Sequence, residues 1–291
     1  MKFTRRRFLA ISAAFTSVPA TSQAQSWQGR ALGADVSLTI QGPREEAAAA
    51  LKETRVLISQ VERLFSLYEP TSSLVALNET GLLLQPGTLF TQLMAAADHA
   101  YLQTDGLFDP TVQPLWAALA KGGDLTLARE AIGWDRVQFD AAKITLGRGQ
   151  ALTLNGIAQG FATDVVSEAL MARGLNKALV NIGEYRGLGG PWTLGVEDPV
   201  HGLLGRRNLT NSAIATSSPA ATPLGVDGHI LHGTARPQWS SVSVEAASAT
   251  IADSLSTAMV LASRDQIGAI KKKTDIRRVT LVDFDGNLTT L

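Results

Sequence analysis

Helical and strand-like patterns alternate irregularly along this chain, and their order restricts the fold more than any other feature. Helical periodicity is clearest over residues 43–67, where Val61, Leu64 and Phe65 share one face. Other helical patterns cover residues 71–81, 89–106, 159–174 and 250–263, and strand or hairpin patterns cover residues 30–40, 137–146, 177–190, 192–199, 240–249 and 277–291. Because no regular strand–helix–strand period connects them, the sequence predicts an α+β fold or a mixed sheet.

Length and charge restrict the number of domains and the class of partner. A chain of 291 residues is long enough for one large domain or two lobes with a full core. We find no internal repeat or clear linker, so residues 25–291 are predicted to form a single domain. The 26 basic and 26 acidic residues balance. A chain without a basic field is not expected to bind nucleic acid.

The N-terminus has the pattern of a cleavable export signal. Residues 1–24 contain Lys2 and the run Arg5–Arg7, then a short apolar stretch and an A-x-A-like cleavage site after Ala24. The sequence TRRRFLA indicates the twin-arginine route, with an ordinary Sec signal as the alternative. We therefore expect a periplasmic mature protein. No later segment is long and apolar enough to serve as a transmembrane anchor.

The absence of cysteine excludes several kinds of site. A cysteine nucleophile, thiolate-bound zinc and iron–sulfur clusters all need a thiolate. His229 and His232 stand three residues apart, but without cysteine or an H-E-x-x-H motif this pair is a weak zinc candidate. A histidine in such a loop also suits a proton shuttle, or is simply a surface residue.

A carboxylate and a hydroxyl are spaced for one face of the helix predicted at residues 250–263. Asp253 and Thr257 are four residues apart, which directs both side chains to the same side. Oxygen ligands of this kind suit a hard cation such as Mg²⁺, often shared with a phosphate. The alternative is that Asp253, close to the start of the helix, only interacts favourably with the helix dipole.

Two loop segments are further candidates. In GLFDPTVQPLW, residues 106–116, Asp109 precedes Pro110 and is biased out of helix, and Phe108 is placed to face a planar ligand. The alternative is a proline-bounded loop that binds nothing. In NGIAQGFATD, residues 155–164, two glycines precede a helix, as they do in phosphate-binding turns. Their spacing matches neither standard nucleotide-binding motif, so a tight turn into the helix is equally consistent.

The order of the motifs is more specific than any one of them. The segments concerned are SLYEPTSSLVALN, GLFDPTVQPLW, LTLNGIAQGFATD, ALVNIGEYRGLG, AIATSS and IADSLSTAMVL. Their order and spacing resemble those of the ApbE family, the FAD:protein FMN transferases, over nearly the whole mature chain. The variants NGIAQG and ADSLST are most similar to the NosX-like branch, which is found with nitrous-oxide reductase accessory genes. The resemblance implies this family's mixed α/β, T-fold-related architecture.

The resemblance also implies a reaction and its partners. Enzymes of this family bind FAD and Mg²⁺, cleave the diphosphate, and attach FMN through a phosphoester to a Thr or Ser hydroxyl of a target flavoprotein, releasing AMP. The cation is expected to bridge diphosphate oxygens and to neutralise charge as the bond to AMP breaks. For the NosX-like branch, the expected acceptor is a membrane flavoprotein of a respiratory electron chain.

Transferred position by position, the family pattern implies roles for individual residues. Asp253 and Thr257 match the metal-binding Asp and Thr, which makes Asp253 essential for catalysis, and Gly156 stands where a backbone carbonyl completes the metal site. His229 matches a histidine expected to help activate the acceptor hydroxyl. The residues expected to contact the flavin or the rest of FAD are Leu32, Tyr68, Leu107, Phe108, Asp109, Thr153 and Gln159.

The sequence departs from the family pattern at two places. After His229 it reads ILHGTARPQW, where Asp-Pro and Thr-Gly are expected, and Gln159 replaces a lysine near the diphosphate. Two alternatives to FMN transfer therefore stay open. One is an FAD carrier or chaperone without catalysis, and the other is an Mg²⁺-dependent FAD pyrophosphatase that uses water as the acceptor.

Overall fold

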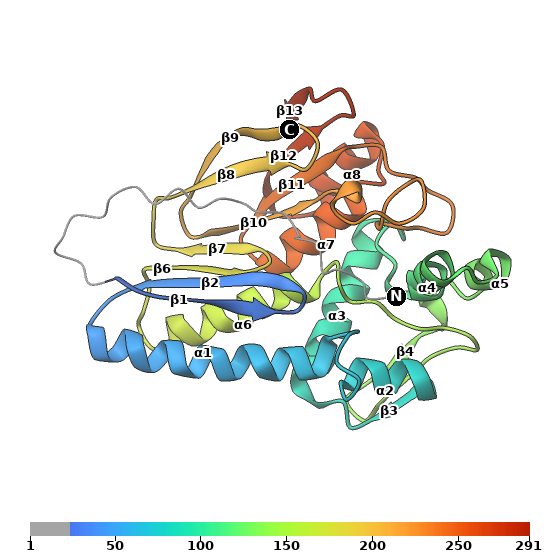
Figure 1. Ribbon diagram of the computed structural model, residues 1–291, viewed down its shortest axis with the longest axis horizontal. Helices are drawn as coiled ribbons and strands as arrows, with labels where there is room; N and C mark the ends of the chain where they lie inside the picture. Colours follow the sequence, from blue (N-terminus) through green and yellow to red (C-terminus); the bar gives the residue numbers. More distant parts are fainter. Residues whose placement is uncertain (1–23) are drawn as a thin grey trace.

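An antiparallel sheet of eight strands organises the part of the chain that this computed structural model describes, residues 24–291. The predicted export signal, apart from Ala24, lies outside the described residues. In spatial order the strands are β1 (Ala24–Ala31), β2 (Ala34–Gln41), β6 (Ala178–Ile182), β7 (Tyr185–Leu188), β10 (Ser212–Ser217), β11 (Ser241–Ala246), β12 (Ile276–Val282) and β13 (Leu288–Thr290). Strands from the two ends of the described chain therefore lie at opposite edges of the sheet (Figure 1).

Two smaller sheets accompany the main one. The first, in the order β3-β5-β4, joins β3 (Leu82–Leu84), β5 (Lys143–Thr145) and β4 (Gln138–Phe139), of which β4 and β5 are the hairpin predicted over residues 137–146. The second is a ribbon of β8 (Trp192–Asp198) and β9 (Gly202–Leu209).

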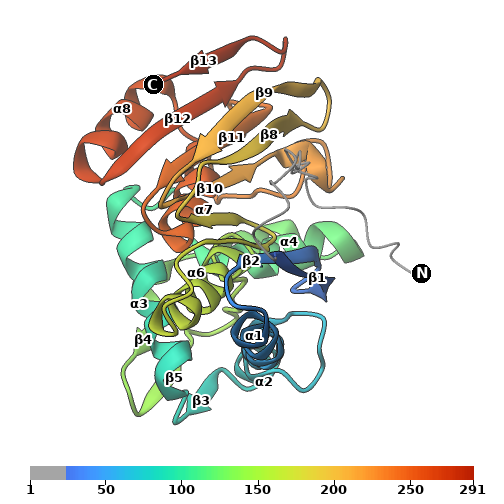
Figure 2. The same cartoon turned by 90° about the vertical axis from the view of Figure 1, so that its left-hand side faces the viewer.

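Two helices lie side by side on one face of the main sheet (Figure 2). The helix α6 (Ala158–Ala172) packs on β6 and β7, and α7 (Ala249–Met259) packs on β10 and β11. The other helices are α1 (Arg44–Phe65), α2 (Ser73–Thr80), α3 (Gly87–Gln103), α4 (Gln113–Lys121), α5 (Leu125–Glu130) and α8 (Arg264–Lys273), with the 3-10 turns η1 (Pro110–Val112), η2 (Trp134–Arg136) and η3 (Pro219–Ala221).

Aromatic contacts connect α6 to the helices α1 and α3. The ring of Phe65, at the end of α1, lies 5.0 Å from that of Phe90 in α3 and 5.9 Å from that of Phe161 in α6, measured between centroids. Phe65 and Phe90 are fully buried. Edge and tilted ring contacts of this kind stabilise a core beyond the area that they bury. They join α6 to α1 and α3.

The contact between α6 and α7 requires a glycine. A Cβ atom at Gly160 would lie 2.3 Å from the carbonyl oxygen of Ala249 and 2.7 Å from the Cβ of Asp253. Both distances are far inside van der Waals contact, so any side chain here would push the two helices apart. The second glycine of NGIAQGFATD is thus a packing residue, and it determines how closely α7 approaches α6.

The predicted α+β class is confirmed, and some element boundaries differ from the predictions. The pattern at residues 30–40 belongs to two strands, because Leu32 and Gly33 adopt positive φ angles and turn the chain between β1 and β2. The pattern at residues 177–190, interpreted as one strand before a glycine-rich turn, is the hairpin of β6 and β7. The elements α4, α5, α8, β9 and β10 carry no pattern that the sequence analysis recognised.

A substitution at Gly160 tests the close contact between the helices. Gly160→Ala is expected to lower the free energy of unfolding by about 1–3 kcal/mol, the usual cost of overpacking a core. Gly268→Ala, inside α8, is the control, because its Cβ would meet nothing within 4 Å. That change should stabilise the protein by about 0.5–1 kcal/mol, since alanine favours helix. Urea denaturation of both variants measures the difference, and a Gly160→Ala protein as stable as the parent would contradict this account.

Candidate functional site

Hydrogen bonds to backbone groups hold residues 152–156, the irregular segment before α6, in place. The side chain of Asn78, in α2, bonds both backbone groups of Leu152, at 2.8 Å to its carbonyl and 2.7 Å from its N–H. The N–H of Thr153 donates to the carbonyl of Pro110 at 2.8 Å. These bonds join segments far apart in the sequence and fix residues 152–156 against the loop that carries Phe108.

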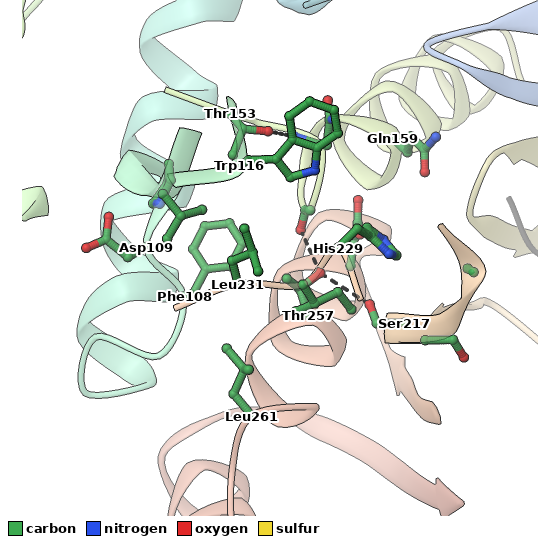
Figure 3. Close-up of a pocket in the computed structure, with 18 of the residues that line it drawn as sticks. Phe108, Asp109, Trp116, Thr153, Gln159, Ser217, His229, Leu231, Thr257 and Leu261 are labelled. Atoms are coloured by element: carbon green, nitrogen blue, oxygen red, sulfur yellow. Dashed lines mark hydrogen bonds between the residues drawn. The ribbon is translucent and has the colours of Figure 1, made fainter. Parts of the chain in front are cut away.

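The three atoms predicted to bind a cation come from α7 and the segment before α6. The hydroxyl of Thr257 donates to the carbonyl oxygen of Gly156 at 3.4 Å (Figure 3). The carboxylate of Asp253, one helical turn before Thr257, accepts the N–H of Gly160 at 2.9 Å through Oδ2. A Cβ at Gly156 would lie 2.8 Å from Oγ1 of Thr257, so the glycine allows the carbonyl and the hydroxyl to come this close.

A serine from β10 extends this polar group. The hydroxyl of Ser217 lies 3.2 Å from that of Thr257 (Figure 3). It also lies 2.8 Å from the hydroxyl of Ser256. Among the described residues, no group of three or more His, Asp and Glu side chains is arranged to hold a metal. The candidate site instead combines one carboxylate with a carbonyl and hydroxyls. This oxygen-only donor set suits Mg²⁺, which takes a few protein oxygens and keeps positions for water or phosphate.

Burial of Asp253 is the electrostatic reason to expect a cation here. The residue is only 3% exposed, and burial raises the pKa of its carboxyl to about 7, against the opposing effect of the Gly160 N–H. None of the ion pairs among the described residues involves Asp253. A divalent cation would supply the missing positive charge, so the residues present fit Mg²⁺.

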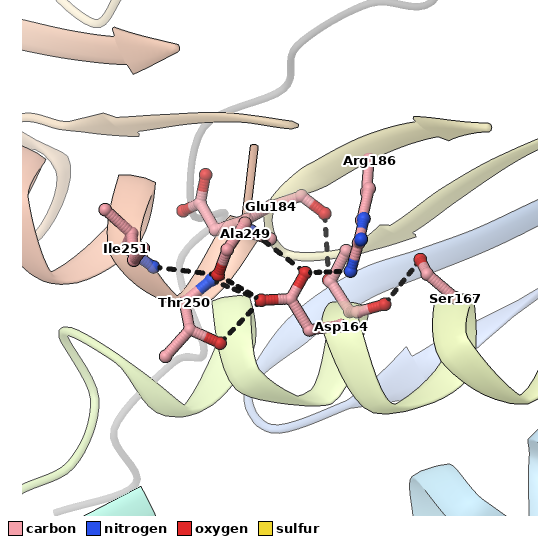
Figure 4. Close-up of polar contacts among 9 residues, drawn as sticks. Asp164, Ser167, Glu184, Arg186, Ala249, Thr250 and Ile251 are labelled. Atoms are coloured by element: carbon pink, nitrogen blue, oxygen red, sulfur yellow. Dashed lines mark hydrogen bonds and ion pairs between the residues drawn. The ribbon is translucent and has the colours of Figure 1, made fainter. Parts of the chain in front are cut away.

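A second buried aspartate, Asp164, fixes the start of α7 (Figure 4). Its carboxylate accepts five hydrogen bonds: from Arg186 at 2.6 Å, the Ser248 hydroxyl at 2.6 Å, the Ala249 N–H at 2.9 Å, and the Thr250 N–H and hydroxyl at 2.8 and 2.6 Å. Free N–H groups at a helix start need such acceptors, and the negative charge suits the helix dipole. Asp164 therefore positions Asp253 from a different helix. The sequence analysis assigned it no role, although it lies four residues after Gly160 on the same face of α6.

An open pocket adjoins these oxygens. Most of the residues that resemblance implied for FAD, metal and catalysis line it: Leu107, Phe108, Asp109, Thr153, Gly156, Gln159, His229, Asp253 and Thr257. Phe108, Leu231 and Leu261 are apolar residues of its lining, and Trp116 also lines it (Figure 3). No lysine or arginine is among the described residues that line it. A diphosphate bound here would therefore depend on a cation for charge neutralisation.

Leu32 and Tyr68 line a smaller adjoining cavity instead. The two cavities share Asn155 and Gln159. Gln159 connects them physically, because its amide Nε2 donates to the carbonyl of Leu32 at 3.1 Å. Tyr68 is 62% exposed at the rim. The predicted FAD contacts thus form two neighbouring groups, and Gln159 lies between them.

Asp109 has a local structural task in addition to its place in the pocket. Its Oδ1 accepts the N–H and the hydroxyl of Thr111, at 2.8 and 2.6 Å, which caps η1. Burial raises the pKa of this carboxyl, while the bonds from Thr111 act in the opposite direction. From the sequence, Asp109 was either a ligand contact or part of a proline-bounded loop. In the structure it lines the pocket and also caps the loop.

The two candidate histidines make hydrogen bonds with different parts of the chain. Nδ1 of His229 lies 3.0 Å from the carbonyl of Pro219, and because a carbonyl only accepts, this nitrogen carries the proton. Burial lowers the pKa of His229, against the opposing effect of hydrogen bonds to the backbone of Pro219 and Thr222, and the net shift favours the neutral ring. Nδ1 of His232 accepts the N–H groups of Thr234 and Ala235. His229, and not His232, lines the pocket.

Glu184 and Ser218 are among the pocket-lining residues that were not recognised from the sequence. Their exposed fractions are 7% and 1%. Each lies inside a segment that carries the resemblance, NIGEYR and ATSS. Glycine and serine neighbours made these segments look like turns, and a turn position does not by itself reveal which side chains are buried.

Comparison with known proteins identifies the fold and its family. The sequence profile of the ApbE family matches residues 32–279, and no curated protein sequence matches the chain significantly. The structure is similar to that of the flavin transferase ApbE from Vibrio cholerae, with a TM-score of 0.79 and 22% identity over 93% of this chain and 97% of that one. It is also similar to the ApbE protein from Thermotoga maritima, with a TM-score of 0.79 and 25% identity over 92% and 96% of the two chains. The flavinyl transferase ApbE from Pseudomonas stutzeri in its apo form has the same TM-score and 21% identity, over 92% and 95%.

Removal of the Asp164 charge tests its control over α7. Asp164→Asn leaves the guanidinium of Arg186 buried without its carboxylate partner, which typically costs about 3–5 kcal/mol. Arg186→Met in the same chain should recover part of this loss, because no unpaired charge then remains. Lys273→Met, which breaks the exposed pair with Asp105, should have little effect. Guanidinium denaturation measures all of these variants, and an Asp164→Asn protein as stable as Lys273→Met would refute the assignment.

Proposed function

This chain belongs to the ApbE family, and from this premise we propose that it is an Mg²⁺-dependent FAD:protein FMN transferase. In this proposal it moves FMN from FAD to a Thr or Ser hydroxyl of a flavoprotein and releases AMP. The observation that supports it most is the grouping of the Gly156 carbonyl with Thr257 and Asp253 beside a pocket with an aromatic wall. Cleavage of FAD at the diphosphate needs oxygen ligands for a cation and, next to them, a surface that binds a planar ring.

The proposed cation ligands are the Gly156 carbonyl, Thr257 and Asp253. A bound Mg²⁺ would neutralise the diphosphate and stabilise the charge that develops on AMP as it leaves. The protein's own part is to orient these oxygens, through the bond from Thr257 to Gly156 and the contact of Gly160 with Asp253. Preorganised ligands lower the cost of reaching the transition state.

The proposed flavin-binding surface is the apolar side of the pocket. Phe108 is 4% exposed and offers an aromatic face that is already fixed by its neighbours. Trp116, Leu231 and Leu261 extend that surface (Figure 3). Stacking and burial of a planar ring on such a surface supply binding energy far from the bond that breaks. The second cavity, with Leu32 and Tyr68, would then take another part of FAD.

His229 is the proposed base for the acceptor hydroxyl. With the proton on Nδ1 held by Pro219, a neutral ring presents Nε2 as the nitrogen that takes a proton. The proton of the Thr or Ser hydroxyl would move to this atom as the hydroxyl oxygen attacks phosphorus. Positioning of the acceptor in line with the departing AMP would supply the rest of the rate gain.

The acceptor is proposed from the resemblance, and the cellular location from the signal pattern of residues 1–24. We propose a periplasmic enzyme, exported by the twin-arginine route, whose acceptor is a respiratory membrane flavoprotein of the kind expected for the NosX-like branch. Within the described residues, no helix has the length and apolar character needed to cross a bilayer.

One observation favours an alternative without transfer. Residues 222–240 contain neither helix nor strand, and they include the stretch after His229 that departs from the family pattern. An FAD carrier or chaperone would bind FAD tightly without forming AMP. An FAD pyrophosphatase would release free FMN in the absence of any acceptor protein. The products therefore distinguish all three functions.

The decisive experiment is a labelling assay. The purified protein is incubated with FAD, Mg²⁺ and a candidate acceptor domain, and covalent flavin is read by fluorescence in a denaturing gel and by mass spectrometry. Transfer predicts a labelled acceptor and AMP in equal amounts. An acceptor that a known ApbE enzyme labels, but this protein does not, would reject the transferase proposal.

Loss of the Asp253 carboxylate should remove activity without unfolding the protein. Asp253→Ala is expected to lower the labelling rate by at least about 100-fold. Loss of a residue that only orients a metal ligand typically costs about 10- to 100-fold in metal affinity or activity, and loss of the ligand itself should cost no less. It should also abolish the rise in melting temperature that Mg²⁺ gives. Asp275→Ala, an exposed residue outside the pocket, is the matched control and should keep both properties. An active Asp253→Ala enzyme would refute the metal assignment.

A charge at position 159 should strengthen diphosphate binding. Gln159→Lys adds a cation where the pocket has none, and we expect FAD to bind several-fold more tightly at low salt, with the gain reduced at high salt. Gln159→Met is the neutral control of similar size and should show no gain. Titrations of FAD fluorescence at two salt concentrations measure the effect. Equal affinities for the Lys and Met variants at low salt would contradict a diphosphate at this position.

A further inference from the structure

Three carboxylates are buried where α6, the β6–β7 hairpin and α7 meet. Asp164 is 6% exposed, Asp253 is 3% exposed and Glu184 is 7% exposed. A buried carboxylate needs hydrogen bonds and a compensating positive charge, because water no longer solvates it. The partners of each one therefore show which of them the fold itself satisfies.

The fold satisfies only Asp164. Its five hydrogen bonds include the ion pair with Arg186, so its charge is compensated. The Glu184 carboxylate lies apart from the donors gathered around Asp164 (Figure 4). Its Oε2 accepts one hydrogen bond, from the backbone N–H of Thr216 at 3.2 Å. Asp253 likewise accepts one, from Gly160. Neither Glu184 nor Asp253 takes part in any ion pair among the described residues.

Glu184 and Asp253 also line the same pocket. Burial raises the pKa of the Glu184 carboxyl well above its usual range, and the negative charge of Asp253 raises it further. With no lysine or arginine among the described lining residues, nothing on this wall compensates the two charges. One divalent cation would balance both.

We infer that Glu184 is a second carboxylate of the divalent-cation site, acting together with Asp253, Thr257 and the Gly156 carbonyl. The inference rests on the cation site of the proposed function and adds a charge to it. A site with two carboxylates binds a divalent cation more tightly than a site with one, because affinity follows the number of charged ligands. Such a site could be loaded before FAD arrives.

A neighbouring hydroxyl independently indicates a ligand on this wall. Ser218 is 1% exposed and lines the pocket, and its Oγ has no hydrogen-bond partner among the described residues. A buried hydroxyl without a partner costs free energy unless a ligand or water satisfies it. Ser218 directly follows β10, whose Thr216 N–H holds Glu184. A cation with bound water or phosphate would supply the missing partner.

A purely structural role explains the Glu184 side chain less well. The structural bond at this residue is made by its backbone carbonyl, which accepts the hydroxyl of Thr163 at 3.0 Å. Any residue supplies that carbonyl. The single bond from Thr216 to the side chain would also form with a neutral glutamine. What only glutamate provides is the charge.

Direct measurement of Mn²⁺ binding, without FAD or acceptor, tests the inference. Isothermal titration of the purified protein compares Glu184→Gln, which removes the charge, with Glu184→Asp, which keeps it. Glu184→Gln should weaken Mn²⁺ binding by roughly 10- to 100-fold, and Glu184→Asp by less. Glu245→Gln is the matched control. Glu245 lies outside the pocket and makes one hydrogen bond, from Ser212, so its loss should leave the affinity within about twofold.

Melting temperatures separate this role from a structural one. Without metal, Glu184→Gln should melt no lower than the parent, because the glutamine oxygen can still accept the Thr216 N–H and burying a neutral amide costs less than burying a carboxylate, and Mn²⁺ should raise its melting temperature less. Mn²⁺ affinity equal to that of Glu245→Gln would overturn the inference and leave the transferase proposal standing. A protein that binds Mn²⁺ through Glu184 but labels no acceptor would support the inference and refute the transferase. A parent protein that binds no Mn²⁺ would overturn the cation site altogether.

Discussion

The close approach of α6 and α7 at Gly160 is the contact on which the candidate site depends. It brings the N–H of Gly160 to the carboxylate of Asp253, and it places the start of α7 beside Asp164. A helix displaced by one side chain would carry Asp253 and Thr257 away from the Gly156 carbonyl. The proposed cation site requires this packing density, because the oxygens of a metal site must converge to within a fraction of an ångström.

Charge is distributed unevenly around this contact. On the sheet side, Asp164 is neutralised by Arg186 and by the first N–H groups of α7, so it serves the fold. On the pocket side, Asp253 and Glu184 are buried with one hydrogen bond each. Proteins retain uncompensated buried charges mainly where a ligand compensates them, and such groups concentrate at functional sites. The difference between the two sides is the physical basis for proposing a cation site in the pocket.

Much of the fold could be predicted, because helices and strands with one buried face carry their periodicity in the sequence. The helices at residues 44–65 and 158–172 are of this kind, and so is the hairpin of β12 and β13. The turn at Leu32 escaped prediction, since a leucine with positive φ is imposed by its surroundings: its N–H donates to Glu62 and its carbonyl accepts from Gln159. Local propensity contains no trace of such distant partners.

The sequence by itself determined the α+β class and the spacing of Asp253 and Thr257, and through the order of its motifs it indicated the family. These properties depend on neighbours a few residues apart or on the whole pattern of the chain. Only the tertiary structure decided that Gly160 is a packing residue, that Asp164 anchors α7, and that Glu184 shares a pocket with Asp253. Each of these depends on contacts between residues about seventy or more positions apart, and no local pattern encodes which distant groups will be buried together.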